Sequence, residues 1–123
     1  MANLVYKRVD VPQGNDFALF EFRQADDTLA ASGDTVAQGL VVSNFKEFSV
    51  QAYDGTRGSM AVAWHGTLDE NELGYSALTD AAGTAISLTA TEVKEVLQVT
   101  YKIKPVISGA GGSSVRIRIF CRN

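Results

Sequence analysis

The strongest structural signal is the stretch Val96-Leu97-Gln98-Val99-Thr100-Tyr101-Lys102-Ile103-Lys104, followed shortly by Ser113-Ser114-Val115-Arg116-Ile117-Arg118-Ile119-Phe120-Cys121-Arg122. Apolar and polar residues alternate along both stretches. Because successive side chains of a strand point to opposite faces of its sheet, each stretch predicts a β-strand with one apolar face. The glycine-rich segment Gly109-Ala110-Gly111-Gly112 lies between them. Two strands joined by such a turn favour an antiparallel hairpin, and we expect the rest of the chain to pack on its apolar face.

The opposite face of the predicted hairpin is cationic. It would carry the side chains of Lys102, Lys104, Arg116, Arg118 and Arg122. Like charges that face each other across a ladder are unfavourable, so such a strip needs neighbours that offset it. Three interpretations stay open: a solvated face interleaved with Glu47, Glu92 or Glu95, a surface for an acidic protein partner, or a nucleic-acid surface. If the strip binds an acidic partner, changing Arg116 and Arg118 to Glu should weaken binding and leave folding nearly intact.

Upstream, short candidate strands recur between turn signals. They cover Leu4–Val11, Phe17–Arg23, Gly39–Ser43, Glu47–Tyr53, Ser59–His65, Tyr75–Thr79 and Ile86–Thr89. No segment shows the apolar periodicity of a helix of about ten or more residues. Many short strands without helices predict an all-β fold, and we expect a single domain built as an antiparallel β-sandwich of jelly-roll-like form. Its core should contain both Met60, Val62 and Trp64 and Val115, Ile117 and Ile119.

The first 38 residues are the least regular part of the chain. Near the start, Val5, Val9 and Val11 share one parity. The next segment is apolar on both faces, with Phe20 and Phe22 on one and Phe17 on the other. It is therefore either a strand buried on both sides or an arm that docks on a partner. Residues 24–39 predict a long loop, or one helical turn at 27–31. We separate residues 1–38, a strand or arm with a partner-contacting loop, from a sandwich core at 39–123, within one domain.

The composition excludes several classes of protein. The chain has 123 residues and a formal net charge of −3, so its total charge gives no reason to bind nucleic acid. No apolar run approaches the roughly 18 residues of a membrane helix, and the N-terminus lacks the apolar core of a signal peptide. The single cysteine cannot form an internal disulfide. We expect a soluble protein that is made in a cytoplasm, with no nucleic-acid or membrane partner.

The residues that carry chemistry do not form a recognisable catalytic set. His65 is the one histidine, and we expect a strand residue with its polar tip at the surface. Cys121 should pack as a small apolar residue beside Ile119. The loop acids Asp69, Glu70 and Glu72 lack the spacing of a calcium site, and the glycine-rich turn lacks the helix and lysine of a phosphate loop. The sequence therefore predicts no enzyme, no cofactor and no metal site.

Several motifs between Phe48 and Arg122 resemble those of small bacteriophage virion proteins. They are Asp54-Gly55-Thr56-Arg57-Gly58, Gly66-Thr67-Leu68-Asp69, Leu78-Thr79-Asp80-Ala81-Ala82-Gly83, Tyr101-Lys102-Ile103-Lys104-Pro105, Ser108-Gly109-Ala110-Gly111-Gly112 and Val115-Arg116-Ile117-Arg118-Ile119. The chain departs from the pattern at Ala52-Tyr53 and at 72–75, where related chains often carry a tryptophan. The set resembles capsid decoration, or cement, proteins, which sit outside an icosahedral head and stabilise it. Residues 1–38 lie outside this resemblance.

The resemblance implies a structural virion protein that binds the outside of an assembled phage capsid. Its partners would be the major capsid protein and further copies of itself, with a homo-oligomer expected and a trimer favoured. Its place would be the capsid surface, after synthesis in the host cytoplasm. The candidate capsid or subunit interface is Phe17, Phe20, Phe22, Lys102, Lys104, Arg116, Arg118 and Arg122. The alternatives are a head–tail joining protein and a β-sandwich binding module of carbohydrate-binding or tail-fibre type, which would use Trp64, Tyr53 and Tyr75 as an aromatic platform.

Overall fold

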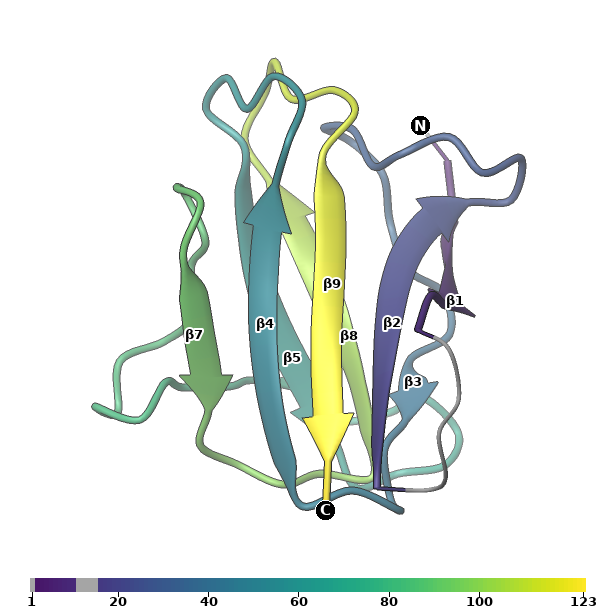
Figure 1. The fold of residues 1–123 in the computed structure, drawn as a ribbon, viewed down its shortest axis with the longest axis vertical. Coiled ribbons are helices and arrows are strands. Elements are labelled where there is room, and N and C mark those ends of the chain that lie inside the picture. The colour runs from purple at the N-terminus through teal and green to yellow at the C-terminus, as the bar shows by residue number, and fades with distance from the viewer. Residues whose placement is uncertain (1, 11–15) are drawn as a thin grey trace.

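Two antiparallel sheets form the protein. The computed structural model describes residues 2–10 and 16–123, and within these residues there are nine strands and no helix. The strands are β1 (Leu4–Arg8), β2 (Phe17–Gln24), β3 (Leu40–Val41), β4 (Glu47–Tyr53), β5 (Ala61–Thr67), β6 (Ser76–Ala77), β7 (Val93–Val96), β8 (Lys102–Ser108) and β9 (Arg116–Arg122). One sheet has the order β1-β2-β9-β4-β7 and the other the order β3-β8-β5-β6. Figure 1 shows them as two layers, with β5 and β8 behind β4 and β9. The predicted β-sandwich is confirmed.

The core lies between the layers and follows the alternation of the sequence. On the five-stranded sheet, the inward side chains of β4 and β9 are buried. They are Phe48, Val50 and Ala52 of β4 and Ile117, Ile119 and Cys121 of β9. The other sheet contributes Val62 and Trp64 from β5 and Ile103 from β8. The Trp64 ring packs edge-on against Phe22 of β2, with 5.8 Å between ring centroids. The prediction that the Trp64 and Ile117 sets share one core is therefore confirmed.

The predicted C-terminal hairpin is wrong. β8 is hydrogen-bonded to β5 and β3, whereas β9 is hydrogen-bonded to β2 and β4 in the other sheet. The glycine-rich segment between them is thus an arch from one layer to the other. It uses left-handed backbone at Gly109, where φ is 82° and an added Cβ would lie 2.0 Å from the carbonyl oxygen of Ser59. An arch buries the two apolar faces against each other across the core, so it satisfies the same alternation as a hairpin.

The first half of the predicted strand from Val96 to Lys104 is also wrong. Residues 97–101 form no strand and instead cross from β7 in the five-stranded sheet to β8 in the four-stranded sheet. Of the apolar residues assigned to the core here, only Ile103 is buried. Leu97 and Val99 keep 56% and 55% of their surface exposed. The alternation is real, but its apolar side faces solvent.

The N-terminal segment is part of the sandwich. β2 lies between β1 and β9, which excludes the interpretation as a free arm, and Phe22 is completely buried. In β1 the buried residue is Leu4, whereas Val5, on the side that the sequence shows as apolar, is exposed, and Val11 lies outside the described residues. The loop after β2 has no helical turn at 27–31. It is fixed at Ala30, which forms a two-way backbone bridge with Val115.

Candidate functional site

The outer face of the five-stranded sheet carries a buried carboxylate, several arginines and a pair of aromatic side chains. Figure 1 looks onto this face, and no other segment crosses in front of β2, β9 and β4. The register places the outward side chains in rows across the strands, for example Leu19–Phe120–Ser49–Glu95 and Glu21–Arg118–Gln51–Val93. We use "outer face" for these residues together with Phe17, Arg23, Glu47, Tyr53, Arg116 and Arg122.

Glu21 is buried under arginines although it lies on the outer face. Its side chain has no exposed surface. Arg118 Nε donates to Glu21 Oε2 at 2.6 Å, and Arg116 Nη1 donates to the same oxygen at 3.2 Å. Arg23 Nε donates to the other carboxylate oxygen. Arg116 also donates to Asp54 at 3.0 Å.

The arginines control the charge of this carboxylate. Burial by itself raises the pKa of Glu21, because it disfavours the anion. The hydrogen bonds from Arg118, Arg23 and Arg116 outweigh that effect, and the pKa of Glu21 lies below its ordinary value. The hydrogen bonds to Glu21 and Asp54 likewise raise the pKa of Arg116. Two of the three predicted arginines are therefore structural ion-pair partners, and the strip is not an unpaired run of positive charge.

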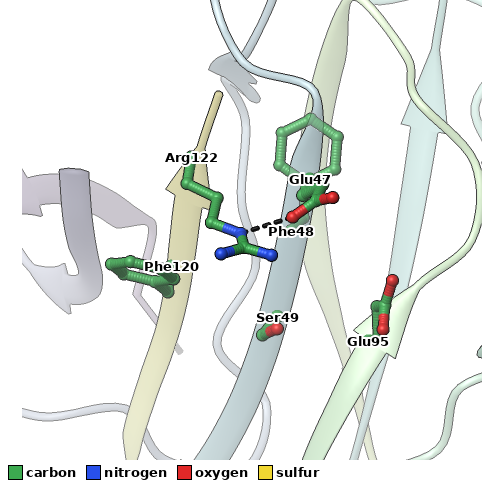
Figure 2. A pocket seen from close by; sticks show the side chains of 6 residues that line it. All are labelled: Glu47, Phe48, Ser49, Glu95, Phe120 and Arg122. Atoms are coloured by element: carbon green, nitrogen blue, oxygen red, sulfur yellow. Dashed lines mark hydrogen bonds and ion pairs between the residues drawn. The ribbon is translucent and has the colours of Figure 1, made fainter. Parts of the chain in front are cut away.

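Arg122 lies at the other end of β9 and has a different environment. Its Nε donates to Glu47 of β4, its cross-strand neighbour, and 58% of the Arg122 side chain is exposed. Figure 2 shows this pair above a hollow of about 200 Å³ whose floor is the small Ser49 side chain. Phe120 lies on the β9 side of the hollow and Glu95 on the β7 side. Glu47 thus has the role that the solvated interpretation of the strip gave it.

A second hollow continues the first along β4. It shares Ser49 and Phe120 with it and is lined further by Leu19, Gln51, Tyr53, Val93 and Arg118. The guanidinium carbon of Arg118 lies 5.7 Å from the centroid of the Tyr53 ring, which is a cation–π distance. The two hollows form a shallow trough along β4, because Ser49 is small and its neighbours on β9 and β7 are larger.

An apolar cluster borders this trough. The rings of Phe17 and Phe120 lie side by side with 5.9 Å between centroids, and Leu19 is the cross-strand neighbour of Phe120. Phe120 keeps 37% of its surface exposed. Large exposed aromatic side chains beside arginines are typical of protein-binding surfaces. The sequence already placed Phe17 and Leu19 on the face opposite Phe22, but Phe120 was missed as an interface residue.

The remaining predicted interface residues lie elsewhere. Lys102 and Lys104 belong to β8, so they lie on the outer face of the other sheet and do not continue the arginines of β9. Lys102 Nζ is 3.0 Å from a Glu72 oxygen, and Lys104 Nζ lies 4.2 Å from the centroid of the Tyr75 ring. The prediction of one continuous strip of five positive charges is therefore wrong, because it depended on a hairpin that does not form.

Phe20 and Phe22 point inward. Phe22 is completely buried, and Phe20 is partly buried against the core. Tyr6 of β1 contacts both rings edge-on, at 6.1 and 6.2 Å between centroids. Of the predicted interface, the outer face thus unites Phe17 with Arg116, Arg118 and Arg122.

The two residues considered for chemistry lie in different sheets, His65 in β5 and Cys121 in β9. Cys121 is buried, and burial raises the pKa of its thiol to about 12, as expected for an apolar packing residue. Burial, and then the charge of Lys104, lower the pKa of His65. Among residues 2–10 and 16–123 no three His, Cys, Asp or Glu side chains gather as metal ligands, and no helix is long and apolar enough to span a membrane.

The aromatic platform does not form. Trp64 is buried in the core, Tyr53 ends β4 of one sheet, and Tyr75 precedes β6 of the other. The three rings therefore cannot bind one sugar chain together. No protein-family model matches the chain, and neither a curated protein nor a solved structure matches it.

Proposed function

We propose that this chain is a structural virion protein, a decoration or cement protein, that binds the outside of an assembled phage capsid through its outer face. The observation that carries the proposal is the contact of the exposed Phe120 ring with the partly exposed Phe17 ring, beside Arg118 and Arg122 on an uncovered sheet. Apolar anchors with a charged border are the composition of a protein-binding surface. The resemblance of 48–122 to small phage virion proteins supports the capsid as the partner.

The mechanism requires no chemistry from the chain. A protein that binds the assembled shell but not free capsid subunits stabilises the shell by mass action. A face built on the paired strands β2, β9 and β4 suits this task, because a preorganised face loses little conformational entropy on binding. The charges near Arg122 are exposed, so they favour encounter with an acidic surface and make attachment sensitive to salt.

The test is a pelleting assay with purified heads of the virus whose genome encodes the chain. Phe120→Ala should reduce the affinity at least about tenfold, as for a central aromatic anchor of an interface. Val41→Ala is the control, because Val41 is similarly exposed but lies in β3 of the opposite sheet. Absence of wild-type protein from the pellet at any salt concentration refutes the proposal. Equal binding by the Phe120 variant refutes the assignment of the face.

A further inference from the structure

The crossover at 97–101 presents an apolar row to solvent. Leu97, Val99 and Tyr101 alternate with Gln98 and Thr100. The two polar residues face the protein: the Gln98 amide donates to Thr79 Oγ1 at 2.8 Å, and the Thr100 side chain fills the space above Gly66, where an added Cβ would lie 2.6 Å from Thr100 Oγ1. The apolar residues therefore point away from the body, which reverses the usual arrangement of an alternating segment.

The backbone of this crossover is held only at its ends. The Leu97 N–H donates to Thr79 at 2.9 Å, and the Tyr101 N–H donates to Thr67 at 3.0 Å. Between these points the N–H and C=O groups of Gln98, Val99 and Thr100 have no hydrogen bond to any residue that the structure describes. The chain next to Thr67 adds Leu68, which is also exposed. An apolar row of this kind marks an interaction surface, because monomers rarely expose contiguous apolar side chains.

An apolar groove lies beside β1, at the edge of the five-stranded sheet opposite β7, the strand from which the crossover departs. β1 and β7 are the two edge strands of that sheet, and Figure 1 shows them on opposite sides of the molecule. Beside β1 the sandwich opens into a groove of about 340 Å³ with mainly apolar walls. The groove is lined by Asn3, Leu4, Val5, Tyr6, Ala37 and Gln38.

The backbone of β1 offers hydrogen bonds along this groove. The Val9 N–H donates to Leu19 of β2, whereas the Leu4 N–H donates outward to Thr35. The N–H and C=O groups of successive residues alternate in direction along an antiparallel strand. Those of Tyr6 and Arg8 therefore point away from β2, as those of Leu4 do. No described strand is paired with β1 on that side. An exposed strand edge of this kind accepts a further extended segment.

We propose that the crossover at 97–101 of one copy docks in the β1 groove of a second copy. The apolar row and the apolar groove are at different places in the molecule, so they can meet only between copies. The unbonded backbone groups of Gln98, Val99 and Thr100 complement the outward backbone groups of β1, and Glu95 would approach Arg8, which is itself paired with Asp10 at 2.8 Å. Glu95 has no ion-pair partner among the described residues. Each copy carries both halves, so the contact is head-to-tail and can close into a ring.

This contact does not depend on capsid attachment, and it is tested on the purified chain alone. Sedimentation from about 1 µM to about 100 µM covers the range in which modest interfaces dissociate. Val99→Glu places a charge in the apolar row, and Ala37→Trp fills the groove. Both side chains are exposed, so the variants should melt near the wild-type temperature. Val93→Glu is the matched control, because Val93 is at least as exposed as Val99 but lies in β7 on the outer face.

We expect the wild type and Val93→Glu to associate, and Val99→Glu and Ala37→Trp each to sediment as monomers. Mixing these two monomeric variants decides the geometry. The intact row of Ala37→Trp still fits the intact groove of Val99→Glu, so the mixture should form one-to-one dimers and nothing larger. A wild type that stays monomeric throughout, variants that associate like the wild type, or a mixture that stays monomeric each overturns the proposal.

Discussion

Glu21 of β2 and Arg118 of β9 are cross-strand neighbours, and the Arg118 Nε donates to the buried Glu21 carboxylate at 2.6 Å. Arg23 and Arg116 bind the same carboxylate. A buried anion is tolerated when it is paired and hydrogen-bonded, and here three guanidinium groups do so. The arginines of β9 therefore stabilise the fold as well as giving the outer face its charge.

Replacing Glu21 with Ala should lower the free energy of unfolding by about 2–4 kcal/mol, since it leaves three adjacent guanidinium groups without their anion. Urea denaturation at neutral pH measures the loss. Glu95→Ala is the control, because Glu95 is an exposed acid of the same face, and it should change stability by less than about 0.5 kcal/mol. Equal stability of the two variants would show that the network contributes nothing.

The same carboxylate predicts a dependence on pH. The pKa of Glu21 is lower in the folded protein than its ordinary value of 4.5, so the folded state favours the anion. This stabilisation is fully present above the unfolded pKa and is lost as the pH falls through the folded pKa. Between about pH 7 and about pH 3, the wild type should lose more stability than Glu21→Gln. Other acids titrate in both proteins, so the difference isolates Glu21, and parallel curves would contradict the prediction.

Ile117→Ala should cost about 2–5 kcal/mol, because the Ile117 side chain is completely buried between the sheets. Phe120→Ala removes a larger side chain from the same strand but from its outer face, and should cost less. The two variants, compared by urea denaturation, test the assignment of the two faces of β9. A greater loss for Phe120→Ala would reverse that assignment.

The sequence predicted which face of each strand is buried better than it predicted which strands are paired. The alternation along β5 and β9 correctly placed Trp64 and Ile117 inside, because a strand with one apolar face has only one way to bury it. The alternation does not say whether two such strands lie side by side or across the core. Both arrangements bury Ile103 and Ile119 equally well, and only the register, which places them in different sheets, distinguishes the arch from the hairpin.

The candidate face could be predicted only in part for the same reason. Arg116, Arg118 and Arg122 were identified because they share a parity within one strand. Their partners, Glu21 and Glu47, lie 75 or more positions away in sequence, and no local pattern links them. The sequence assigned the apolar row at 97–101 to the core, because apolar residues of an alternating segment usually face inward. In the structure Gln98 and Thr100 contact the body of the protein instead, so the apolar residues point to solvent.

Cys121 should be unreactive in the folded protein. Burial raises the pKa of its thiol to about 12, so almost no thiolate is present at pH 8, and the side chain is also inaccessible. Labelling with a chromogenic disulfide reagent should therefore be slow in buffer and fast and stoichiometric in concentrated urea. Rapid labelling of the folded protein would place Cys121 at the surface, against its position beside Ile119.

Charge reversal on β9 should have different effects at its two ends. Arg116→Glu with Arg118→Glu should unfold the protein, against the expectation from sequence, because two new anions would face the buried Glu21 carboxylate. Arg122→Glu should leave stability within about 1 kcal/mol, since the Arg122–Glu47 pair is exposed at the end of the sheet.

If an acidic capsid surface meets this end of the face, Arg122→Glu should weaken binding to heads at low salt and differ less from wild type at high salt. Pelleting of heads at two salt concentrations measures both effects, with Lys104→Glu on the opposite sheet as the control. Equal occupancy by wild type and Arg122→Glu at low salt would leave attachment to the apolar cluster at Phe17 and Phe120.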